Sequence, residues 1–196
     1  MQANDEIEDG QTPLDPDEAH GLIPNWVATR GDLNEVENEN INLAYAWADN
    51  ALRRREEVAS DQFLRGLHTA MFGLVWTWAG TYRNTERNIG VAPHQISTQL
   101  RQLFDDTHAW REFNTYAMDE QAYRLHHRLT AIHPFPNGNG RSSRLMADYY
   151  LTQNGAAPFT WGVRRIQPNH VRRTYLEAIR EADSGNYAPL AGFVRG

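Results

Sequence analysis

The chain has 196 residues, of which 40% are hydrophobic, and a formal net charge of −6. This length and apolar content fit one globular domain with a sizeable core. No apolar run approaches the roughly 18 residues that cross a bilayer, so we expect a cytoplasmic protein with no membrane partner. Seven acidic residues within positions 1–20 account for the whole net charge, so the rest of the chain is near neutral and direct nucleic-acid binding is not expected.

Cysteine and lysine are both absent, so all 19 basic residues are arginine. The lack of cysteine excludes disulfides, thiolate nucleophiles and zinc–thiolate sites. The lack of lysine excludes a lysine Schiff base and a Walker A loop, whose lysine reaches the phosphates. An anion bound by this chain must be held by arginine, by backbone N–H groups, by helix N-termini or by a metal. Arginine suits this task because its planar fork binds phosphate oxygens in pairs.

The first part of the chain divides into a lead-in and the start of a domain. Residues 1–30 are acidic and interrupted by proline, which predicts an extended or irregular segment before a domain over 31–196. A helix is expected from Asp32, which can cap it, with Glu35 at the capping-box position. The apolar spacing over 51–75 predicts another helix.

The stretch from Trp78 to Ile96 is rich in glycine and extended-chain formers, which predicts a small hairpin or ordered loop. The rest of the chain has the pattern of helices separated by proline and glycine. These helices are expected over about 95–113, 119–132, 141–153 and 168–183. The sequence therefore predicts a mainly α fold with one short β-hairpin.

One window of the sequence combines several residue types that suit phosphate chemistry. It reads His133-Pro134-Phe135-Pro136-Asn137-Gly138-Asn139-Gly140-Arg141, followed by Ser142, Ser143 and Arg144. Pro134 ends the preceding helix and leaves His133 at the mouth of the loop. Gly138 and Gly140 allow the backbone to turn its N–H groups inward just before a new helix begins. Such groups, with a helix N-terminus behind them, form an anion-binding cradle.

Arg141 and Arg144 lie three residues apart on the predicted helix, so both can contact further phosphate oxygens. His133 is neutral at pH 7 when its pKa is near 6.5 and can accept a proton from an attacking hydroxyl. The plainer interpretation of the window is a glycine-rich turn with His133 as a polar cap. The combination of a base, an apolar anchor, two glycines and two arginines favours the chemical interpretation.

This window resembles the signature of the Fic family, H-x-F-x-[D/E]-G-N-G-R-x-x-R. Residues 78–83, Trp-Ala-Gly-Thr-Tyr-Arg, also resemble the W-A-G-x-[YF]-R run of Fic proteins, and the similarity covers about residues 30–195. The resemblance implies a Fic-type helical bundle with a β-hairpin flap. It further implies transfer of AMP from ATP to a serine, threonine or tyrosine hydroxyl of a target protein.

The resemblance also assigns roles to individual residues. His133 would deprotonate the target hydroxyl, which then attacks the α-phosphorus. Gly138, Asn139 and Gly140 would hold the α- and β-phosphates, and Arg141 and Arg144 would engage the outer phosphates. A target segment would pair in strand-like fashion with a flap. The flap residues are Arg87, Asn88, Ile89, Gly90 and Val91.

Position 137 departs from the family pattern. Asn137 stands where the family has Asp or Glu, the residue expected to bind the Mg²⁺ that bridges the phosphates. An asparagine offers one neutral carbonyl oxygen, which is a weaker ligand for a hard dication than a carboxylate. We therefore expect a magnesium ion held by Asn137, water and the phosphates of ATP, with transfer that demands more Mg²⁺.

Many Fic proteins are restrained by a helix with the pattern [S/T]-x-x-x-E-[G/N], whose Glu pairs with the second signature arginine. Here that arginine is Arg144, and the nearest matches to the pattern end in Glu37-Asn38 and in Glu39-Asn40. Both lack the hydroxyl at the first position. The resemblance thus implies inhibition by Glu37 or Glu39, against the alternative of an acidic solvent-facing helix.

Several further expectations concern specificity and partners. Tyr175, Tyr187 and Leu190 are expected to help line the base pocket, and Trp78 and Trp161 are weaker candidates for contact with the base. His126 and His127 are not spaced as helical metal ligands, so structural roles are expected for them. Similarity to the mobile mystery protein B group suggests a bacterial, toxin–antitoxin-like setting with a helix-turn-helix partner encoded nearby. Family resemblance also suggests a homodimer.

Two alternatives to AMP transfer stay open. The same fold can transfer UMP, GMP or, as in Doc toxins, a phosphate, although Doc-like proteins depart from the intact Gly138-Asn139-Gly140-Arg141 run. The other alternative is a catalytically weak protein in which Asn137 marks a nucleotide-binding site that signals through the N-terminal helix.

Overall fold

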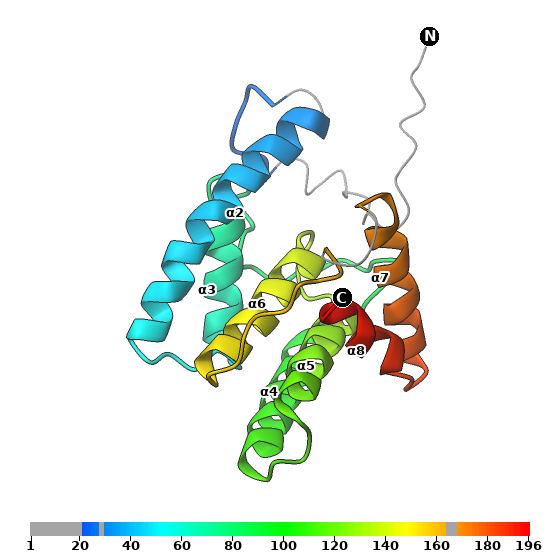
Figure 1. The fold of residues 1–196 in the computed structure, drawn as a ribbon. Helices are drawn as coiled ribbons and strands as arrows, with labels where there is room; N and C mark the ends of the chain where they lie inside the picture. Colours follow the sequence, from blue (N-terminus) through cyan, green and yellow to red (C-terminus); the bar gives the residue numbers. More distant parts are fainter. Residues whose placement is uncertain (1–20, 28–29, 164–167) are drawn as a thin grey trace.

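The computed structural model describes residues 21–27, 30–163 and 168–196. In this part the chain is a bundle of seven α-helices with a short 3-10 helix and no sheet (Figure 1). The elements are α2 (Arg30–Arg53), α3 (Asp61–Phe72), η1 (Pro93–Gln95), α4 (Ile96–Glu112), α5 (Met118–Ile132), α6 (Asn139–Gln153), α7 (Pro168–Asp183) and α8 (Ala188–Val194). The expected mainly α fold is confirmed. None of these described helices is both long and apolar enough to cross a membrane.

Helix α2 packs against α3 through small side chains. Ala44, Ala48 and Ala51 recur at helical spacing and are fully buried, so α2 presents a smooth stripe to its neighbour. A Cβ added at Gly66 of α3 would lie 2.5 Å from the Trp47 ring, so the close approach of the two helices requires glycine there.

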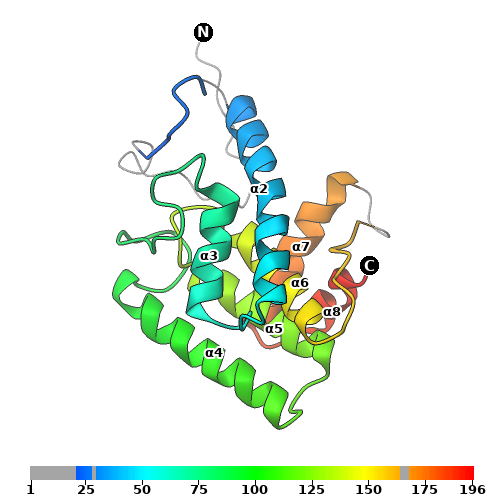
Figure 2. The same ribbon diagram turned by 90° about the vertical axis from the view of Figure 1, so that its left-hand side faces the viewer.

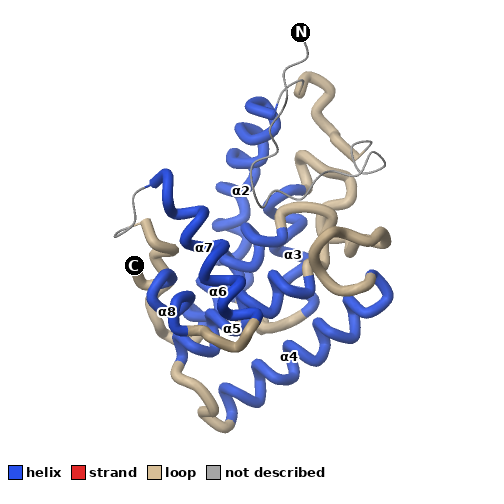
Figure 3. Tube along the Cα trace, turned by 90° about the vertical axis from the view of Figure 1, so that its right-hand side faces the viewer, coloured by secondary structure: helices blue, strands red, loops and turns tan. Residues whose placement is uncertain are grey.

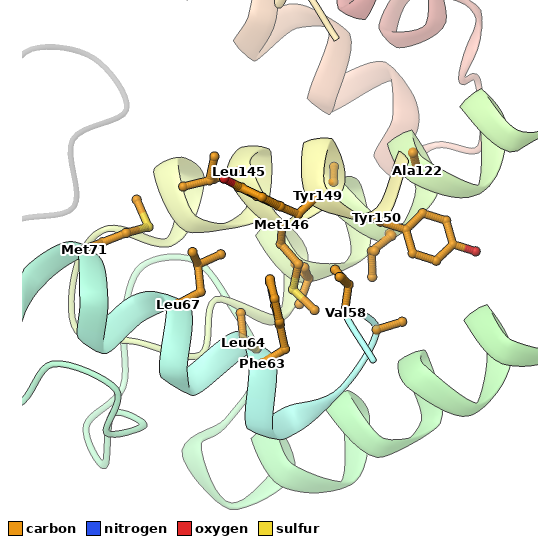
Figure 4. Close-up of a cluster of buried hydrophobic side chains, with 14 of the residues drawn as sticks. Val58, Phe63, Leu64, Leu67, Met71, Ala122, Leu145, Met146, Tyr149 and Tyr150 are labelled. Carbon is orange, nitrogen blue, oxygen red and sulfur yellow. The ribbon is translucent and has the colours of Figure 1, made fainter. Parts of the chain in front are cut away.

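The central core lies between α3 and α6, where Figure 4 shows Phe63, Leu64 and Leu67 of α3 beneath Met146 and Tyr149 of α6. All five side chains are buried. Helix α4 lies along the lower edge of the molecule in Figure 2 and packs against α5. Helices α7 and α8 pack against each other on the opposite side of α6 from α3 (Figure 1). This arrangement leaves the turn between α5 and α6 bordered by α2, α3 and α7.

The bounds predicted for a helix over 51–75 are wrong, because α3 covers only Asp61–Phe72. Helix α2 continues to Arg53, and the chain then turns through Arg55, whose φ is 58°. Ser60 caps α3 by accepting a hydrogen bond from the N–H of Phe63 (3.1 Å). The short helix α8 was not predicted.

The expected β-hairpin is not formed. Residues 81–92 are an ordered loop without strand pairing, as Figure 3 shows by the tan tube. The reason is that the loop packs on the turn after α5 instead of on itself: the N–H of Val91 donates to the carbonyl of Ile132 (3.2 Å). Among the described residues the only β-type contact is an isolated bridge between Leu22 and Trp76.

The predicted boundary between lead-in and domain also changes. The N–H of Ile23 donates to Val75 and that of Thr77 donates to Gly21, both at 2.8 Å, so this part of the expected lead-in is joined to the domain. The acidic residues 1–20 lie outside the described residues.

Candidate active site

His133 stands at the end of α5 in a left-handed backbone conformation, with φ 53° and ψ 61°. Its N–H still donates to the carbonyl of Leu129 (3.0 Å), which closes the helix. Pro134 then prevents the helix from continuing. This left-handed conformation is rare for a residue other than glycine and is maintained by surrounding contacts.

The loop after His133 is held from within by Phe135 and Asn139. The Phe135 ring is fully buried and stacks on His68 of α3 at a centroid distance of 3.7 Å. The Asn139 amide accepts from the N–H of Phe135 and donates to its carbonyl, both at 2.8 Å. The Asn139 side chain therefore shapes the loop, and only its backbone N–H remains for the expected phosphate contact.

His68 is a further site residue, and sequence reasoning missed it. Its Nδ1 accepts from the N–H of Gly80 (3.0 Å), so its Nε2 carries the proton and donates to the carbonyl of Asn137 (3.0 Å). Burial lowers the pKa of His68 to about 3, which keeps the ring neutral. His68 thus ties the signature loop to the Trp-Ala-Gly turn. In the sequence, its position on the apolar face of α3 is only a weak indication of this role.

The two signature glycines meet different surroundings. Gly138 has φ 77°, and a Cβ there would lie 2.5 Å from the Phe72 ring. Gly140 lies in the first turn of α6, lines the cleft, and a Cβ there would meet no atom within 4 Å. Because α6 begins at Asn139, the first N–H groups of α6 have no carbonyl partner in their own helix. The first turn of α6 therefore has the N–H groups that the predicted anion cradle needs.

Arg141 is paired with Glu37 of α2. Its Nη1 donates to Oε2 of the carboxylate (2.6 Å), and the Nε1–H of Trp76 donates to Oε1 (2.8 Å). The Arg141 guanidinium also lies 4.7 Å from the centroid of the Phe72 ring. Glu37 is only 3% exposed, so α2 places a buried carboxylate directly on a signature arginine.

The expected pairing of an inhibitory carboxylate with Arg144 is wrong. Arg144 faces α7, where its guanidinium lies 5.3 Å from the centroid of the Tyr175 ring. The hydroxyl of Tyr175 is in turn 3.1 Å from Nε2 of His126, which supports the structural role expected for this histidine. Glu39 is exposed and does not line the cleft, so the alternative candidate for inhibition is also wrong.

A cleft of about 710 Å³ opens over the cradle. His133, Gly138, Gly140, Arg141 and Arg144 all line it, so the structure brings the predicted site residues together. Apolar and aromatic side chains from the far end of the chain form its other wall: Trp161, Val163, Val171, Tyr175, Leu176 and Phe193.

Of the three residues expected to line a base pocket, Tyr175 lines the cleft, whereas Tyr187 and Leu190 lie elsewhere. Leu190 is fully buried in α8, and the hydroxyl of Tyr187 contacts Nδ1 of His127 at 3.0 Å. Neither lines the cleft. Trp161, the weaker candidate, does line it and is held by a hydrogen bond from its Nε1–H to Asp148 (2.9 Å).

His133 is 5% exposed, and its surroundings favour the neutral ring. Burial, together with the positive charges of Arg83 and Arg87, lowers its pKa to about 4. At neutral pH the ring is therefore a proton acceptor, as a general base requires. Among the expected flap residues, Ile89 is 51% exposed and lines the same cleft. The flap thus lies beside His133, although it is a loop.

Asn137 turns its side chain into the loop, where Oδ1 accepts from the N–H of Gly138 (2.7 Å). In the described part of the chain, no three His, Cys, Asp or Glu side chains are grouped so that they could hold a metal. One neutral oxygen that is already bonded does not fit a magnesium site built by the protein.

Comparison with known proteins matches this site to one family. Residues 59–151 match the model of the Fic/DOC family. Protein adenylyltransferase fic-1 of Caenorhabditis briggsae is 28% identical over 169 residues, which cover 82% of this chain and 31% of that protein. Protein adenylyltransferase Fic of Nematostella vectensis is 28% identical over 180 residues, or 88% of this chain and 40% of that one.

A solved structure supports the same assignment. Fic-1 (aa134 - 508) from C. elegans has a TM-score of 0.67 and 25% identity, over 91% of this chain and 51% of that one. This chain spans only about a third of the length of the curated relatives it matches. The matched region includes α3, the Trp-Ala-Gly turn and the whole signature loop. Residues 59–151 of the chain thus match the Fic/DOC family, and the fold of 91% of the chain resembles that of a solved Fic protein.

Proposed function

We propose that this chain is a protein adenylyltransferase that transfers AMP from ATP to a serine, threonine or tyrosine hydroxyl of a target protein. One observation carries the proposal: a buried, neutral His133 shares a cleft with the N-terminal turn of α6 and both signature arginines. A base beside an anion cradle is the arrangement that nucleotidyl transfer needs. The names of the matched relatives, protein adenylyltransferases, agree with it.

The proposed reaction is a displacement at the α-phosphorus. The target hydroxyl oxygen forms a bond to this phosphorus while the bond to the oxygen that bridges the α- and β-phosphates breaks. His133 accepts the hydroxyl proton, and pyrophosphate leaves. The backbone N–H groups at the start of α6 stabilise the charge that develops on the phosphate oxygens, because they already point at them.

The two walls of the cleft suggest how ATP is oriented. Arg141 and Arg144 lie on the α6 side of the cleft and suit the phosphates of ATP, because their guanidinium groups are positively charged hydrogen-bond donors. Trp161, Tyr175 and Val171 lie on the opposite wall and suit the face of a purine ring. Magnesium would arrive with ATP and be held mainly by its phosphates. No step of the proposed mechanism depends on a metal bound by the protein.

We also propose that α2 inhibits this reaction through Glu37. With Arg141 engaged by the buried carboxylate, the guanidinium is not available to the outer phosphates of ATP. Displacing Glu37 requires either a movement of α2 or a competing phosphate. The proposed inhibition differs from the sequence-based expectation only in the arginine that is held.

Labelled ATP tests the proposal against phosphate transfer. The chain is incubated with a mixture of cellular proteins and ATP labelled at either the α- or the γ-phosphate. Adenylyl transfer predicts that protein acquires the α label and not the γ label, and that unlabelled ATP competes better than UTP or GTP. Label only from γ-labelled ATP would favour a Doc-like phosphotransferase and would contradict the proposal.

A further inference from the structure

Arg83 is a buried cation whose hydrogen bonds converge on His133 and on the flap loop. Only 3% of Arg83 is exposed. Its Nε donates to the carbonyl of His133 (2.6 Å) and its Nη2 to that of Ile132 (3.4 Å). From the same guanidinium, Nη1 donates to Thr85 (2.9 Å) and Nη2 also donates to Val91. One side chain therefore bridges the turn at residues 132–133, the end of the flap at Val91 and the loop that leads into the flap at Thr85.

The backbone of Arg83 adds to this bridge, because its N–H donates to the carbonyl of Pro134 (2.9 Å). The carbonyls of three consecutive residues, 132–134, thus bond to Arg83. These contacts surround His133, a residue other than glycine with a left-handed backbone, and they offset the free energy that this conformation costs. Burying a guanidinium is itself costly unless it is fully hydrogen-bonded.

The flap lies directly against His133. A Cβ added at Gly90 would be 2.6 Å from Cβ of His133 and 2.7 Å from Nη2 of Arg83. The N–H of Val91 also donates to the carbonyl of Ile132. A displacement of this loop must therefore change the hydrogen bonds of Arg83, and these same bonds hold the backbone of His133.

We propose that Arg83 is a positioning residue that couples the target-docking flap to the geometry and protonation of His133. A target segment that orders the flap thereby fixes the base in the position from which it accepts the hydroxyl proton. The inference rests on the proposed role of His133 as the general base. It adds a residue outside the signature whose effect on the reaction passes entirely through another side chain.

Charge supports this role. The charged groups that act on His133 are Arg83 and Arg87, and both disfavour a second positive charge on the imidazole. Removing the Arg83 charge makes the protonated ring less unfavourable, so the pKa of His133 rises and the acid limb of the pH–rate profile moves to higher pH. A residue that only stabilised the fold would not shift this limb.

The test compares Arg83→Met, Arg83→Lys and the control Arg65→Met. Arg65 also donates to a backbone carbonyl near the same corner, that of Gly80 (2.9 Å), but it has no bond to the His133 turn. The pKa of His133 is followed by NMR titration of the imidazole signals, with His133→Ala to identify its resonance. ATP affinity, the KM for the target and kcat are measured on the same variants.

We expect Arg83→Met to raise the pKa of His133 by about one unit and to lower kcat about tenfold or more, with ATP affinity changed less than about twofold. Arg83→Lys should keep the pKa low, because it retains the charge, but lose part of kcat. Arg65→Met should behave as the wild type. An unchanged His133 pKa and an unchanged kcat in a folded Arg83→Met chain would overturn the inference.

Two provisions keep the test decisive. If Arg83→Met does not fold, Gly90→Ala displaces the flap while Arg83 stays in place, and it should lower kcat without loss of ATP affinity; an unchanged kcat would count against the coupling. If no variant, including the wild type, transfers a nucleotide, the proposed function fails. The NMR titration still decides in that case whether Arg83 sets the protonation of His133.

Discussion

At the scale of single residues, the two glycines of the signature, Gly138 and Gly140, differ in what the fold requires of them. Gly138 is required by its own backbone, since φ 77° and the nearby Phe72 ring both exclude a side chain. Gly140 is under no such constraint, because a Cβ there would meet no neighbouring atom. In a helical position alanine is even more stable than glycine by up to about 1 kcal/mol. The fold therefore does not require a glycine at this position, and a ligand that approaches the backbone would.

We therefore predict opposite outcomes for two similar substitutions. Gly140→Ala should keep or raise the melting temperature and weaken ATP binding, because the methyl group occupies the cradle. Gly138→Ala should lower the melting temperature by several degrees through strain and collision with Phe72. Thermal unfolding with and without ATP measures both effects. Unaltered ATP binding by Gly140→Ala would mean that the phosphates do not lie on the first turn of α6.

Asn137 leads to a second prediction at this scale. Its amide oxygen is bonded to the N–H of Gly138. A carboxylate can keep that bond with one oxygen and present the other to a cation. Asn137→Asp should therefore lower the Mg²⁺ concentration needed for half-maximal transfer by about tenfold. The Mg²⁺ dependence of initial rates measures this, and identical curves for both proteins would place position 137 away from the metal.

At the scale of elements, an ion pair between Glu37 and Arg141 joins α2 to the start of α6. Glu37→Gln keeps an acceptor for the Nε1–H of Trp76 but removes the charge that holds the guanidinium. ATP affinity and the rate of transfer should rise about threefold to tenfold, the range expected for a charged hydrogen bond. Glu39→Gln changes an exposed carboxylate on the same helix and is the matched control. Equal activity of the two variants would remove α2 as an inhibitor.

The elements also show what local sequence can predict. Helices α4, α5 and α7 were expected within about two residues of their bounds, since proline or glycine marks their ends. The break between α2 and α3 was missed, because Arg55 adopts a left-handed conformation that its sequence does not require. The predicted hairpin was wrong because the backbone of residues 81–92 pairs with the turn at residues 132–134, about 40 to 50 positions away.

The site likewise has one part that the local sequence predicts and another part that depends on long-range contacts. His133, the cradle and both arginines lie within one continuous window, so sequence alone could bring them together. Arg83 and His68 act through contacts with residues 50 and 69 positions away, respectively, which a single sequence does not reveal. The partner of Glu37 likewise depends on how α6 is rotated about its axis. Sequence motif and tertiary packing therefore determine different parts of one site.

At the scale of the whole molecule, buried histidines link the fold to pH. Burial lowers the pKa of His68 and His126 to about 3 and that of His133 to about 4, from an ordinary value of 6.5. Below pH 6.5 the unfolded chain binds protons at these sites and the folded chain does not. The free energy of unfolding therefore decreases as the pH is lowered, by up to about 1.4 kcal/mol per pH unit for each histidine.

We predict that the melting temperature falls steadily as the pH is lowered from 7 to 5. His68→Asn should make this dependence shallower, whatever its effect at pH 7, because one proton-linked site is removed. His94→Gln changes an exposed histidine and serves as the control. Thermal unfolding at several pH values measures the slopes. A melting temperature that is constant between pH 7 and 5 would contradict the neutral, buried state of these rings.

The central claim is that His133 is the base of an adenylyl transfer that begins on the cradle of α6. The most direct test measures transfer of α-labelled AMP by Glu37→Gln chains with and without His133→Ala, together with their ATP affinity. The account predicts that His133→Ala abolishes transfer by at least about a hundredfold and leaves ATP affinity nearly unchanged. Transfer that persists at a similar rate without His133 would contradict the account.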